Sequence, residues 1–407
     1  MRILVISSVF PNSKHPLYGV FVKERMARVA RGCELVVVAP VPWFPFNRLF
    51  RGVETEGIPA YEVQDSIPVY HPKFLSVPGV LKCLDGFFYF LSVLPLARRL
   101  RRSFRFDLID AHFAYPDGFA GCLLAKVFRC PVIVTLRGTI GKLSKFVLRR
   151  VQIQWVLRTA ARVIAVSDSL GSIANSLGAA PEKMRVIPNG VDTTTFHPSD
   201  REGARKRLGF PLNETVILSV GALSERKGHH RVLQVLPRIA EKRPDVRYVV
   251  VGEAGVEGNI EPLLSRLSKE LGVQDRVRLV GARPHEEIAQ WLAAADVFCL
   301  ATSNEGMANV ILESLACGVP VVTTQVGGNA ELISHEENGY LVPLGDPDAL
   351  GLALLRALEG QWNREKIAGE LKRRSWDATA TRVLEEFLNV VSNPASEIAA
   401  EDTSVKV

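Results

Sequence analysis

Two glutamates eight residues apart, Glu305 and Glu313, lie in the segment of this sequence whose residue types are best suited to chemistry. A glycine-containing turn follows Glu305, and an apolar helix is predicted to begin near Asn309 and to end at Gly318. The amides of residues 306–310 would be unpaired at the start of that helix, where the helix dipole favours an anion such as a diphosphate. Eight helical residues rise about 12 Å, so one carboxylate would meet a sugar and the other a nucleoside, both of which donate hydrogen bonds to carboxylates.

An Asp-x-Asp pair, Asp346 and Asp348, is the other acidic motif in the chain. Such a pair binds a metal–diphosphate in some transferases. Here Pro347 and an apolar helical pattern follow, so we interpret the aspartates as helix-capping residues and predict no metal site.

Short runs rich in β-branched residues alternate with amphipathic stretches, as in parallel strands joined by helices. The predicted strands are 3–7, 35–39, 108–111, 132–136, 163–166, 185–188, 216–220, 248–251, 277–280, 297–300 and 320–324. The predicted helices include 20–31, 118–128, 229–241, 261–271, 286–293 and 310–317. The expected fold is α/β, with two Rossmann-like doubly wound parallel-sheet domains whose ligand-binding strand ends face each other across a cleft.

A chain of 407 residues exceeds the roughly 250–300 residues at which a single hydrophobic core stops growing, so two domains are expected. The segment 190–213 is polar and contains few strand-forming residues, which indicates the break. The predicted organisation is a first Rossmann-like domain at 1–195, a second Rossmann-like domain at 196–375, a closing helix at 376–393 and a disordered tail at 394–407.

The cysteines and the amino terminus indicate a cytoplasmic protein. The six cysteines form no C-x-x-C pair and mostly have apolar neighbours, as expected for reduced, buried thiols. The first ten residues, MRILVISSVF, lack a small-residue cleavage site and are interpreted as a strand, not as a signal peptide.

Charge is distributed unequally: residues 1–199 hold 26 Lys and Arg against 13 Asp and Glu, whereas the remainder holds 24 against 30. The basic half is expected to face something anionic, such as a phosphate-rich lipid surface or acceptor. Nucleic acid is not the expected partner, because no helix-turn-helix, zinc finger or aromatic-studded binding strand is apparent.

The segment 79–105 is apolar but is interrupted by Lys82, Asp85 and Pro95, so it is not expected to span a bilayer. Two interpretations stay open. One is a core helix with a solvated basic end. The other is a peripheral contact with anionic lipid on the inner face of the cell membrane, serving a polyprenyl-linked acceptor. The basic residues that favour the contact are Arg98, Arg99, Arg101, Arg102, Arg105, Lys142, Lys145, Arg149, Arg150 and Arg158.

The chain resembles glycosyltransferase family 4, a group of retaining enzymes with the GT-B fold, over roughly residues 1–390. Besides the Glu305/Glu313 pair, the motifs that carry the resemblance are GVFVKERMARVA at 19–30, HFAYPDGFAG at 112–121, RVIPNGVDTTTFHP at 185–198, VGALSERKGHH at 220–230, VVVGEAG at 249–255 and VRLVGARPHEEIAQWLAAADVFCLAT at 277–302. The resemblance implies transfer of a hexose-type unit from a UDP- or GDP-sugar onto a saccharide or lipid-linked acceptor in polysaccharide or glycolipid biosynthesis. It also implies retention of anomeric configuration, with no cofactor and no obligatory metal. By the same resemblance, the domain at 1–195 would bind the acceptor and the domain at 196–375 would bind the nucleotide sugar.

The same resemblance assigns roles to matching residues. Glu305 would contact the donor sugar near the reacting carbon, and Glu313 would contact the ribose. Lys227 would neutralise the diphosphate, with Arg226 as a second cation. The remaining donor-binding residues that it implies are Gly19, Arg283, Gly306, Met307, Ala308, Asn309 and Val310.

Two positions depart from the family pattern. Ala222 stands where the family usually has an arginine, and Arg137 follows the fourth strand where a histidine is common. Arg137 would bind a phosphate or a hydroxyl, or donate to an oxygen during the reaction, but it cannot act as a base because it stays protonated. His112 is a second candidate for acceptor contact, with a purely structural buried histidine as the alternative.

Three other functions stay open at this point. A nucleotide-sugar epimerase would have the same architecture but need no acceptor. A nicotinamide-dependent oxidoreductase should carry a glycine fingerprint after the first strand, where ISSVFPN stands instead. A non-catalytic scaffold is favoured by Ala222 and Arg137 and disfavoured by the intact Glu305, Lys227 and Glu313.

Overall fold

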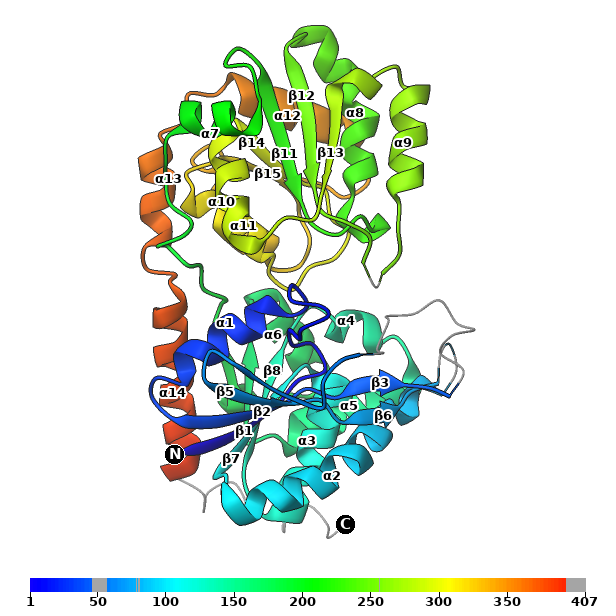
Figure 1. Ribbon diagram of the computed structural model, residues 1–407, viewed down its shortest axis with the longest axis vertical. Helices are drawn as coiled ribbons and strands as arrows, with labels where there is room; N and C mark the ends of the chain where they lie inside the picture. Colours follow the sequence, from blue (N-terminus) through cyan, green and yellow to red (C-terminus); the bar gives the residue numbers. More distant parts are fainter. Residues whose placement is uncertain (46–56, 78, 80, 256, 393–407) are drawn as a thin grey trace. The chain divides into compact units, whose positions relative to one another are not determined.

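The computed structural model describes residues 1–45, 57–77, 79, 81–255 and 257–392 (Figure 1). The structure divides into two compact units: unit 1 holds Met1–Asn189 together with the described residues from Trp376 onward, and unit 2 holds Gly190–Ser375. The boundary between units thus follows Asn189, whereas the sequence pattern predicted a domain boundary after residue 195. The predicted disordered tail at 394–407 lies outside the described residues.

Within its described residues, unit 1 is built on an eight-stranded sheet in the order β10-β9-β8-β7-β1-β2-β5-β4. All neighbouring strands pair in parallel except β4 and β5. The strands are β1 (Arg2–Ile6), β2 (Glu34–Val38), β4 (Tyr61–Gln64), β5 (Ile67–Tyr70), β7 (Leu108–His112), β8 (Val132–Leu136), β9 (Arg162–Ala165) and β10 (Met184–Val186), while β3 (Val41–Trp43) and β6 (Lys73–Leu75) form a separate pair. Both β7 and β8 are buried at every position, as expected for central parallel strands covered on both faces.

The helices of unit 1 include one from the far end of the chain. They are α1 (Val20–Val29), α2 (Asp85–Ser103), α3 (Phe119–Phe128), α4 (Ile140–Leu143), α5 (Val147–Thr159), α6 (Asp168–Ser176) and α14 (Trp376–Ser392). Val383 and Phe387 of α14 share one apolar core with Met26 and Val29 of α1 and with Val37 of β2. The last described helix therefore completes the core of the first unit.

Unit 2 has its own sheet, six-stranded over the described residues, in the parallel order β13-β12-β11-β14-β15-β16. Its strands are β11 (Thr215–Val220), β12 (Val246–Val251), β13 (Val277–Gly281), β14 (Val297–Leu300), β15 (Val321–Thr324) and β16 (Gly339–Val342). Its helices are α7 (Arg201–Leu208), α8 (His229–Lys242), α9 (Glu261–Glu270), α10 (His285–Ala294), α11 (Asn309–Ala316), α12 (Pro347–Glu359) and α13 (Arg364–Leu371). Tyr248, Leu236 and Leu354 are fully buried in its core.

All the strands expected from apolar runs are present with small shifts at their ends, and the α/β class is confirmed. The strands without such a run, β3 to β6 and β16, were not predicted. The turn between β4 and β5 contains Asp65 and Ser66, both with positive φ. Because this pair is not the Asn-Gly or Asp-Gly typical of two-residue hairpins, the turn was not predicted from the residues.

Most of the segment 79–105 forms α2, which packs on unit 1 through one face. Tyr89, Val93 and Ala97 are buried along that face, whereas Phe87 and Leu91 on the helix are exposed. The core-helix interpretation therefore holds for the buried face. Among the described residues, no helix combines the length and the apolar character that crossing a membrane requires.

Candidate active site

A carboxylate and two cations meet beyond the end of β14 in unit 2. Lys227 Nζ and Arg226 Nη1 each donate to Glu305 Oε1 at 2.7 Å. Thr302 Oγ1 donates to the same oxygen at 3.3 Å. We call Arg226, Lys227, Thr302 and Glu305 the Glu305 cluster. Three residues that the sequence proposed for donor binding thus lie in direct contact.

The backbone holds the two loops of this cluster together. The short helix η5 (Glu225–Lys227) ends at Gly228, which has φ +79°. A Cβ atom there would lie 1.9 Å from the carbonyl oxygen of Ala301, so only glycine fits. Ser303 N donates to Arg226 O at 2.8 Å. The loop after β11 is therefore fixed against the loop after β14.

Electrostatics keep Glu305 ionised. Burial raises the pKa of its carboxyl, but Lys227 and Arg226 outweigh burial and hold that pKa below its usual value. Burial lowers the pKa of Arg226, and the carboxylates of Glu305 and Glu257 reverse this effect and raise it. Glu257 Oε2 accepts from Arg226 Nε at 2.7 Å. Arg226 thus lies between two carboxylates, whereas the only ion pair of Lys227 found among the described residues is with Glu305.

The helix α11 begins at Asn309, as the sequence predicted. Ile311 N donates to Ala308 O at 3.0 Å in its first turn, and this turn lies at the positive end of the helix dipole. Gly306 O accepts from Gly328 N at 2.9 Å. A Cβ on Gly327 would lie 1.8 Å from the carbonyl oxygen of Glu305. A second glycine loop therefore supports the turn from which Glu305 projects.

Glu313, the second acid, lies within α11 and has a different partner. Its Oε1 accepts from Nε2 of His285 at 2.9 Å, and the His285 ring lies 5.1 Å from that of Phe196 between centroids. Sequence reasoning missed His285, although it is the first residue of α10 and follows a proline in a segment that carried the family resemblance. The two candidate acids are thus held separately, one by cations and one by a histidine.

The other predicted donor-binding residues have the following surroundings. Met307 and Ala308 are buried, and Val310 is half-buried at the start of α11. Arg283 Nη1 donates to Ala282 O at 2.7 Å. Gly19 has φ +80° before α1, and a Cβ there would lie 2.5 Å from Val9 O. These contacts explain the local structure, and donor binding by these residues stays a prediction.

In unit 1, His112 and Arg137 lie side by side at the carboxyl ends of β7 and β8. Arg137 Nη2 donates to His112 Nδ1 at 3.3 Å, and Arg137 Nη1 donates to Asn189 Oδ1 at 3.2 Å. His112 Nε2 lies 3.1 Å from Asp110 Oδ2. Burial, with a smaller effect of Arg137, lowers the pKa of His112 to about 4. His112 is therefore a neutral, buried histidine, and its acceptor contact stays a prediction.

A buried carboxyl, Asp117, joins three elements of unit 1. It lies in the π-helical turn η3 (Ala114–Gly118) and accepts bonds from the backbone amide and the hydroxyl of Ser8, the latter at 2.9 Å. Tyr89 of α2 donates to it at 3.1 Å. Burial raises the pKa of Asp117 to about 7, although Ser8 and Tyr89 oppose that rise. Asp117 lies in the motif HFAYPDGFAG at 112–121, which carried the family resemblance, but sequence reasoning assigned it no role.

The Asp-x-Asp motif caps a helix, as predicted. Asp346 precedes α12 and its side chain accepts from Ala349 N at 2.8 Å, with Pro347 as the first helical residue. Among the described residues, no group of three or more His, Cys, Asp or Glu side chains could hold a metal ion.

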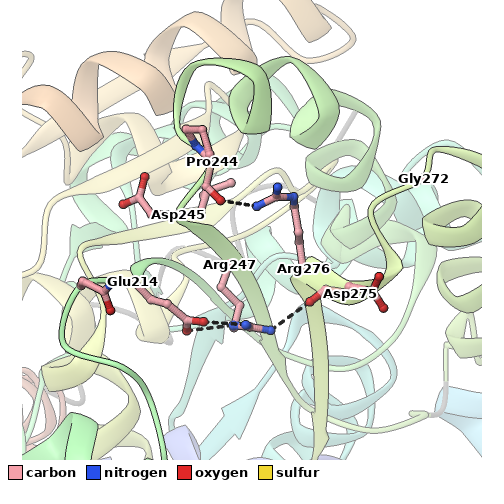
Figure 2. A pocket seen from close by; sticks show the side chains of 9 residues that line it. Glu214, Pro244, Asp245, Arg247, Gly272, Asp275 and Arg276 are labelled. Atoms are coloured by element: carbon pink, nitrogen blue, oxygen red, sulfur yellow. Dashed lines mark hydrogen bonds and ion pairs between the residues drawn. The ribbon is translucent and has the colours of Figure 1, made fainter.

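A hollow of about 350 Å³ lies in unit 2 at the amino ends of β11 and β12 (Figure 2). Arg247 donates to Glu214 at 2.5 and 2.8 Å and to Asp275 O at 3.1 Å. Arg276 donates to the carbonyl of Pro244. The guanidinium groups are thus engaged by protein acceptors, and the hollow lies at the opposite strand ends from those that bind ligands in this fold class. The hollow is therefore not part of the candidate site.

The two halves of the chain match two family models. Residues 22–195 match the model described as glycosyltransferase family 4. Residues 200–374 match the model described as glycosyl transferases group 1.

Individual relatives cover most of the chain. A protein of Bacillus subtilis (strain 168), whose name assigns it provisionally to teichuronic acid biosynthesis as the glycosyltransferase TuaC, is 30% identical over 91% of this chain and 92% of its own. A D-inositol 3-phosphate glycosyltransferase of Acidothermus cellulolyticus is 29% identical over 84% of this chain and 77% of its own.

Solved structures share the fold. Sucrose-phosphate synthase from Thermosynechococcus elongatus has a TM-score of 0.81 at 20% identity, covering 96% of this chain and 99% of its own. Anabaena HepE in complex with UDP-glucose has a TM-score of 0.72 at 22% identity, covering 96% and 100%.

Proposed function

Because the chain belongs to glycosyltransferase family 4, we propose that it transfers a sugar from a UDP- or GDP-linked donor to a saccharide or lipid-linked acceptor. That it is a glycosyltransferase follows from the family. The donor, the acceptor, the retention of anomeric configuration and the role in cell-surface polysaccharide or glycolipid biosynthesis are the proposal.

The Glu305 cluster is the observation that carries the proposal. A nucleotide-sugar donor has a diphosphate and, next to it, sugar hydroxyls. The cations of Lys227 and Arg226 suit the diphosphate, and the Glu305 carboxylate suits the sugar hydroxyls. All three side chains meet in a single set of contacts at 2.7 Å. The nearby start of α11 adds amide donors and a favourable dipole for phosphate oxygens.

The same residues support a mechanism. When the glycosidic bond to the donor breaks, negative charge develops on the departing nucleoside diphosphate. In our proposal Lys227, Arg226 and the α11 amides stabilise that charge, which is usually the largest contribution to catalysis. Because these groups carry the positive charge that a divalent metal supplies elsewhere, we propose a reaction without an obligatory metal or cofactor. No side chain is assigned as a nucleophile or base.

Glu313 is proposed to accept hydrogen bonds from the ribose hydroxyls. Its hydrogen bond from His285 at 2.9 Å fixes one carboxylate oxygen, which leaves the other to accept. His112 and Arg137 of unit 1 are the proposed acceptor-side residues.

Thermal-shift measurements with UDP, GDP, ADP and their sugars test donor binding, since a ligand that binds only the native state raises its melting temperature. We expect one base to stabilise the protein, by about 2.7 kcal/mol at a hundredfold excess over Kd. Lys227→Ala and Glu313→Ala should each abolish this shift. Lys269→Ala and Glu270→Ala, at exposed positions on α9, are matched controls and should keep it. A full shift in both site variants would show that the nucleotide binds elsewhere.

Product analysis separates this function from its rivals. A transferase needs an acceptor and should retain the anomeric configuration, which NMR of the product detects. An epimerase would convert the sugar nucleotide with no acceptor present, and that outcome would contradict transfer.

We also propose that unit 1 contacts an anionic membrane to reach a lipid-linked acceptor. Supporting this is a surface at the start of α5, the α5 patch, made of Lys142, Lys145, Phe146, Val147, Leu148, Arg149, Arg150 and Val151. Its apolar members are exposed, Val147 to 75%, and cations lie among them. Gln152, which follows the last residue of the patch, donates through Nε2 to Cys83 O at 2.8 Å, so α5 contacts the segment that precedes α2. Exposed apolar side chains among cations are typical of surfaces that bind anionic lipid.

Liposome flotation at low and high salt tests the contact. Wild type should float with anionic vesicles at low salt, and less at high salt because ions screen the attraction. Val147→Ser with Leu148→Ser should weaken flotation, whereas Leu212→Ser, which is exposed but lies in unit 2, should not. Failure to bind anionic vesicles at any salt concentration would contradict the proposal.

A further inference from the structure

Four buried polar side chains of unit 1 form a group with more hydrogen-bond donors than acceptors. Asp110 and His112 lie on β7, Arg137 follows β8 and Arg25 lies on α1. Each is at most 4% exposed. We call these four residues the arginine cluster.

Hydrogen-bond chemistry fixes the charges in the arginine cluster. A guanidinium can only donate, so the contact of Arg137 with Nδ1 of His112 makes that nitrogen an acceptor. The proton of His112 is then on Nε2, which donates to Asp110. The histidine is neutral, and two guanidinium groups are opposed by a single carboxylate. The cluster therefore has one buried positive charge in excess.

Several polar atoms of the cluster make no hydrogen bond within the described part of the chain. They are Nε and Nη2 of Arg25, Nε of Arg137 and Oδ1 of Asp110. Asp110 acts on Arg25 electrostatically, yet no ion pair within 4.0 Å links the two. Leaving a buried charge without a partner costs several kcal/mol. A group that served only to stabilise the fold would be expected to pair these atoms with one another.

The location of the cluster points to a ligand. It lies at the carboxyl ends of adjacent parallel strands β7 and β8, which are the strand ends that bind ligands in doubly wound sheets. Arg137 is also held in place: its guanidinium carbon lies 4.6 Å from the ring centre of Phe21, and Asn189 accepts from Nη1. The two terminal nitrogens of Arg137 are thus positioned by Asn189 and His112, while Nε is buried and has no hydrogen-bond partner among the described residues.

We propose that Arg25 and Arg137 bind a carboxylate or phosphate carried by one of the sugar substrates, with Asp110 accepting a hydroxyl of the same sugar. The planar guanidinium matches both anions in geometry and charge. The anion would supply the missing negative charge of the cluster. This inference rests on the proposed glycosyl transfer and narrows its substrate class to acidic or phosphorylated sugars, on the donor or on the acceptor.

Binding of simple sugars tests the site directly. At constant ionic strength, glucuronate and glucose 6-phosphate should raise the melting temperature of the wild type, whereas glucose should not. Arg25→Gln and Arg137→Gln should each raise the Kd for the anionic sugars by about tenfold to a hundredfold, as expected for a lost charged hydrogen bond. Arg129→Gln, at an exposed arginine of the same unit, should bind like wild type. Equal responses to glucose and the anionic sugars, or unchanged responses in both variants, would overturn the proposal.

Folding of the variants is checked without ligand. Arg25→Gln removes a buried cation with two unpaired nitrogens and should lower the melting temperature little, whereas Arg137→Gln also loses the hydrogen bonds to His112 and Asn189 and is expected to lower it. Arg137→Lys therefore provides the second test: it keeps the charge but loses the planar fork, and it should still bind the anionic sugars more weakly than wild type. Wild-type affinity in Arg137→Lys would overturn the assignment of this guanidinium.

Turnover identifies which substrate carries the anion. In one arm UDP-glucuronate is compared with UDP-glucose, and in the other a phosphorylated acceptor is compared with its neutral form. The wild type should have the higher kcat/KM for the anionic substrate in one of these two comparisons, whichever substrate carries the anion. Arg137→Gln should remove that preference. A preference that survives in the variant, or no preference in either arm, would overturn the inference. The nucleotide-induced thermal shift should persist in Arg25→Gln and Arg137→Gln, so its absence in wild type would count against the proposed donor site and not against this one.

Discussion

At the scale of single residues, the contacts of Glu305 with two cations would compete with donor binding. One of its oxygens accepts from both Lys227 and Arg226. A diphosphate would compete for these cations, since its oxygens are stronger partners for them than one shared carboxylate oxygen. In our proposal, donor binding therefore loosens this ion pair and releases Glu305 toward the sugar.

Replacement of Glu305 by glutamine should separate binding from chemistry. Glu305→Gln removes a negative charge beside the cations, so the Kd for the nucleoside diphosphate should stay the same or fall. Turnover should drop by at least about tenfold, because a charged hydrogen bond to the reacting sugar is worth about 1.5–3 kcal/mol. Calorimetry with UDP or GDP and a transfer assay measure the two effects.

The matched control is Glu270→Gln, an exposed glutamate of α9, which should change neither quantity. Weaker diphosphate binding in Glu305→Gln with normal turnover would contradict the assigned role.

At the scale of elements, close backbone contacts position the side chains of the site. The turn at Gly228 packs against the end of β14, and η3 is tied to the loop after β1 through Asp117 and Ser8. The first junction is so closely packed that it has no room for a Cβ on Gly228. The second is held by hydrogen bonds to the buried Asp117 carboxyl.

Gly228→Ala should destabilise unit 2 and weaken donor binding. Its φ of +79° and the 1.9 Å approach to Ala301 O together should cost more than the 1–3 kcal/mol typical of a strained residue. Gly209→Ala is the matched control, with φ +73° and no atom within 4 Å of the added Cβ. Denaturant unfolding and thermal shift with nucleotide compare them. Equal losses in the two variants would show that the contact with β14 has no effect.

Asp117 should make the stability of unit 1 depend on pH. Its folded pKa of about 7 lies above the unfolded value of 3.8, so the folded state binds the extra proton. The contribution of Asp117 to the free energy of unfolding is fully present below about pH 4 and is lost as the pH rises to about 7. Over that range it falls by at most about 1.4 kcal/mol per pH unit. Asp117→Asn should remove this fall.

Unfolding of wild type and Asp117→Asn between pH 4 and 8 measures the effect. Glu182→Gln, at an exposed acid of the same unit, should follow the wild type. Parallel pH curves for wild type and Asp117→Asn would contradict the role of this carboxyl.

At the scale of the whole molecule, the last described helix belongs to the first unit. The chain leaves unit 1 after Asn189, forms unit 2 and returns at Trp376 to place α14 in the core of unit 1. Unit 1 is therefore incomplete until residues near the end of the chain are present.

Phe387→Ala should destabilise unit 1 by about 3–5 kcal/mol, the usual cost of removing a buried phenylalanine. Phe387 is fully buried, whereas its neighbour Leu388 is 53% exposed, so Leu388→Ala should change little. Hydrogen exchange should accelerate in α1 and the unit 1 strands of the Phe387 variant and stay unchanged in β11 and β12. Faster exchange mainly in unit 2 would show that α14 stabilises the other unit.

The sequence by itself determined the local structure. Apolar runs predicted β7, β8, β11 and β14, because parallel strands buried on both faces leave no polar alternation. The glycine turn and the apolar helix after Glu305 predicted the start of α11 at Asn309, and the Pro347 context predicted the cap at Asp346. These features depend on residues that are neighbours along the chain.

Only the tertiary structure decided which side chains meet. Lys227 and Glu305 are 78 residues apart, and they touch because β11 pairs directly with β14 while β12 and β13 lie on its other side. The pairing of β7 with β8 likewise joins His112 to Arg137. Strand order depends on how all the layers pack, which no local pattern encodes. For that reason the sequence identified Glu305, Lys227 and Glu313 but not His285, Asp117 or the buried Arg25.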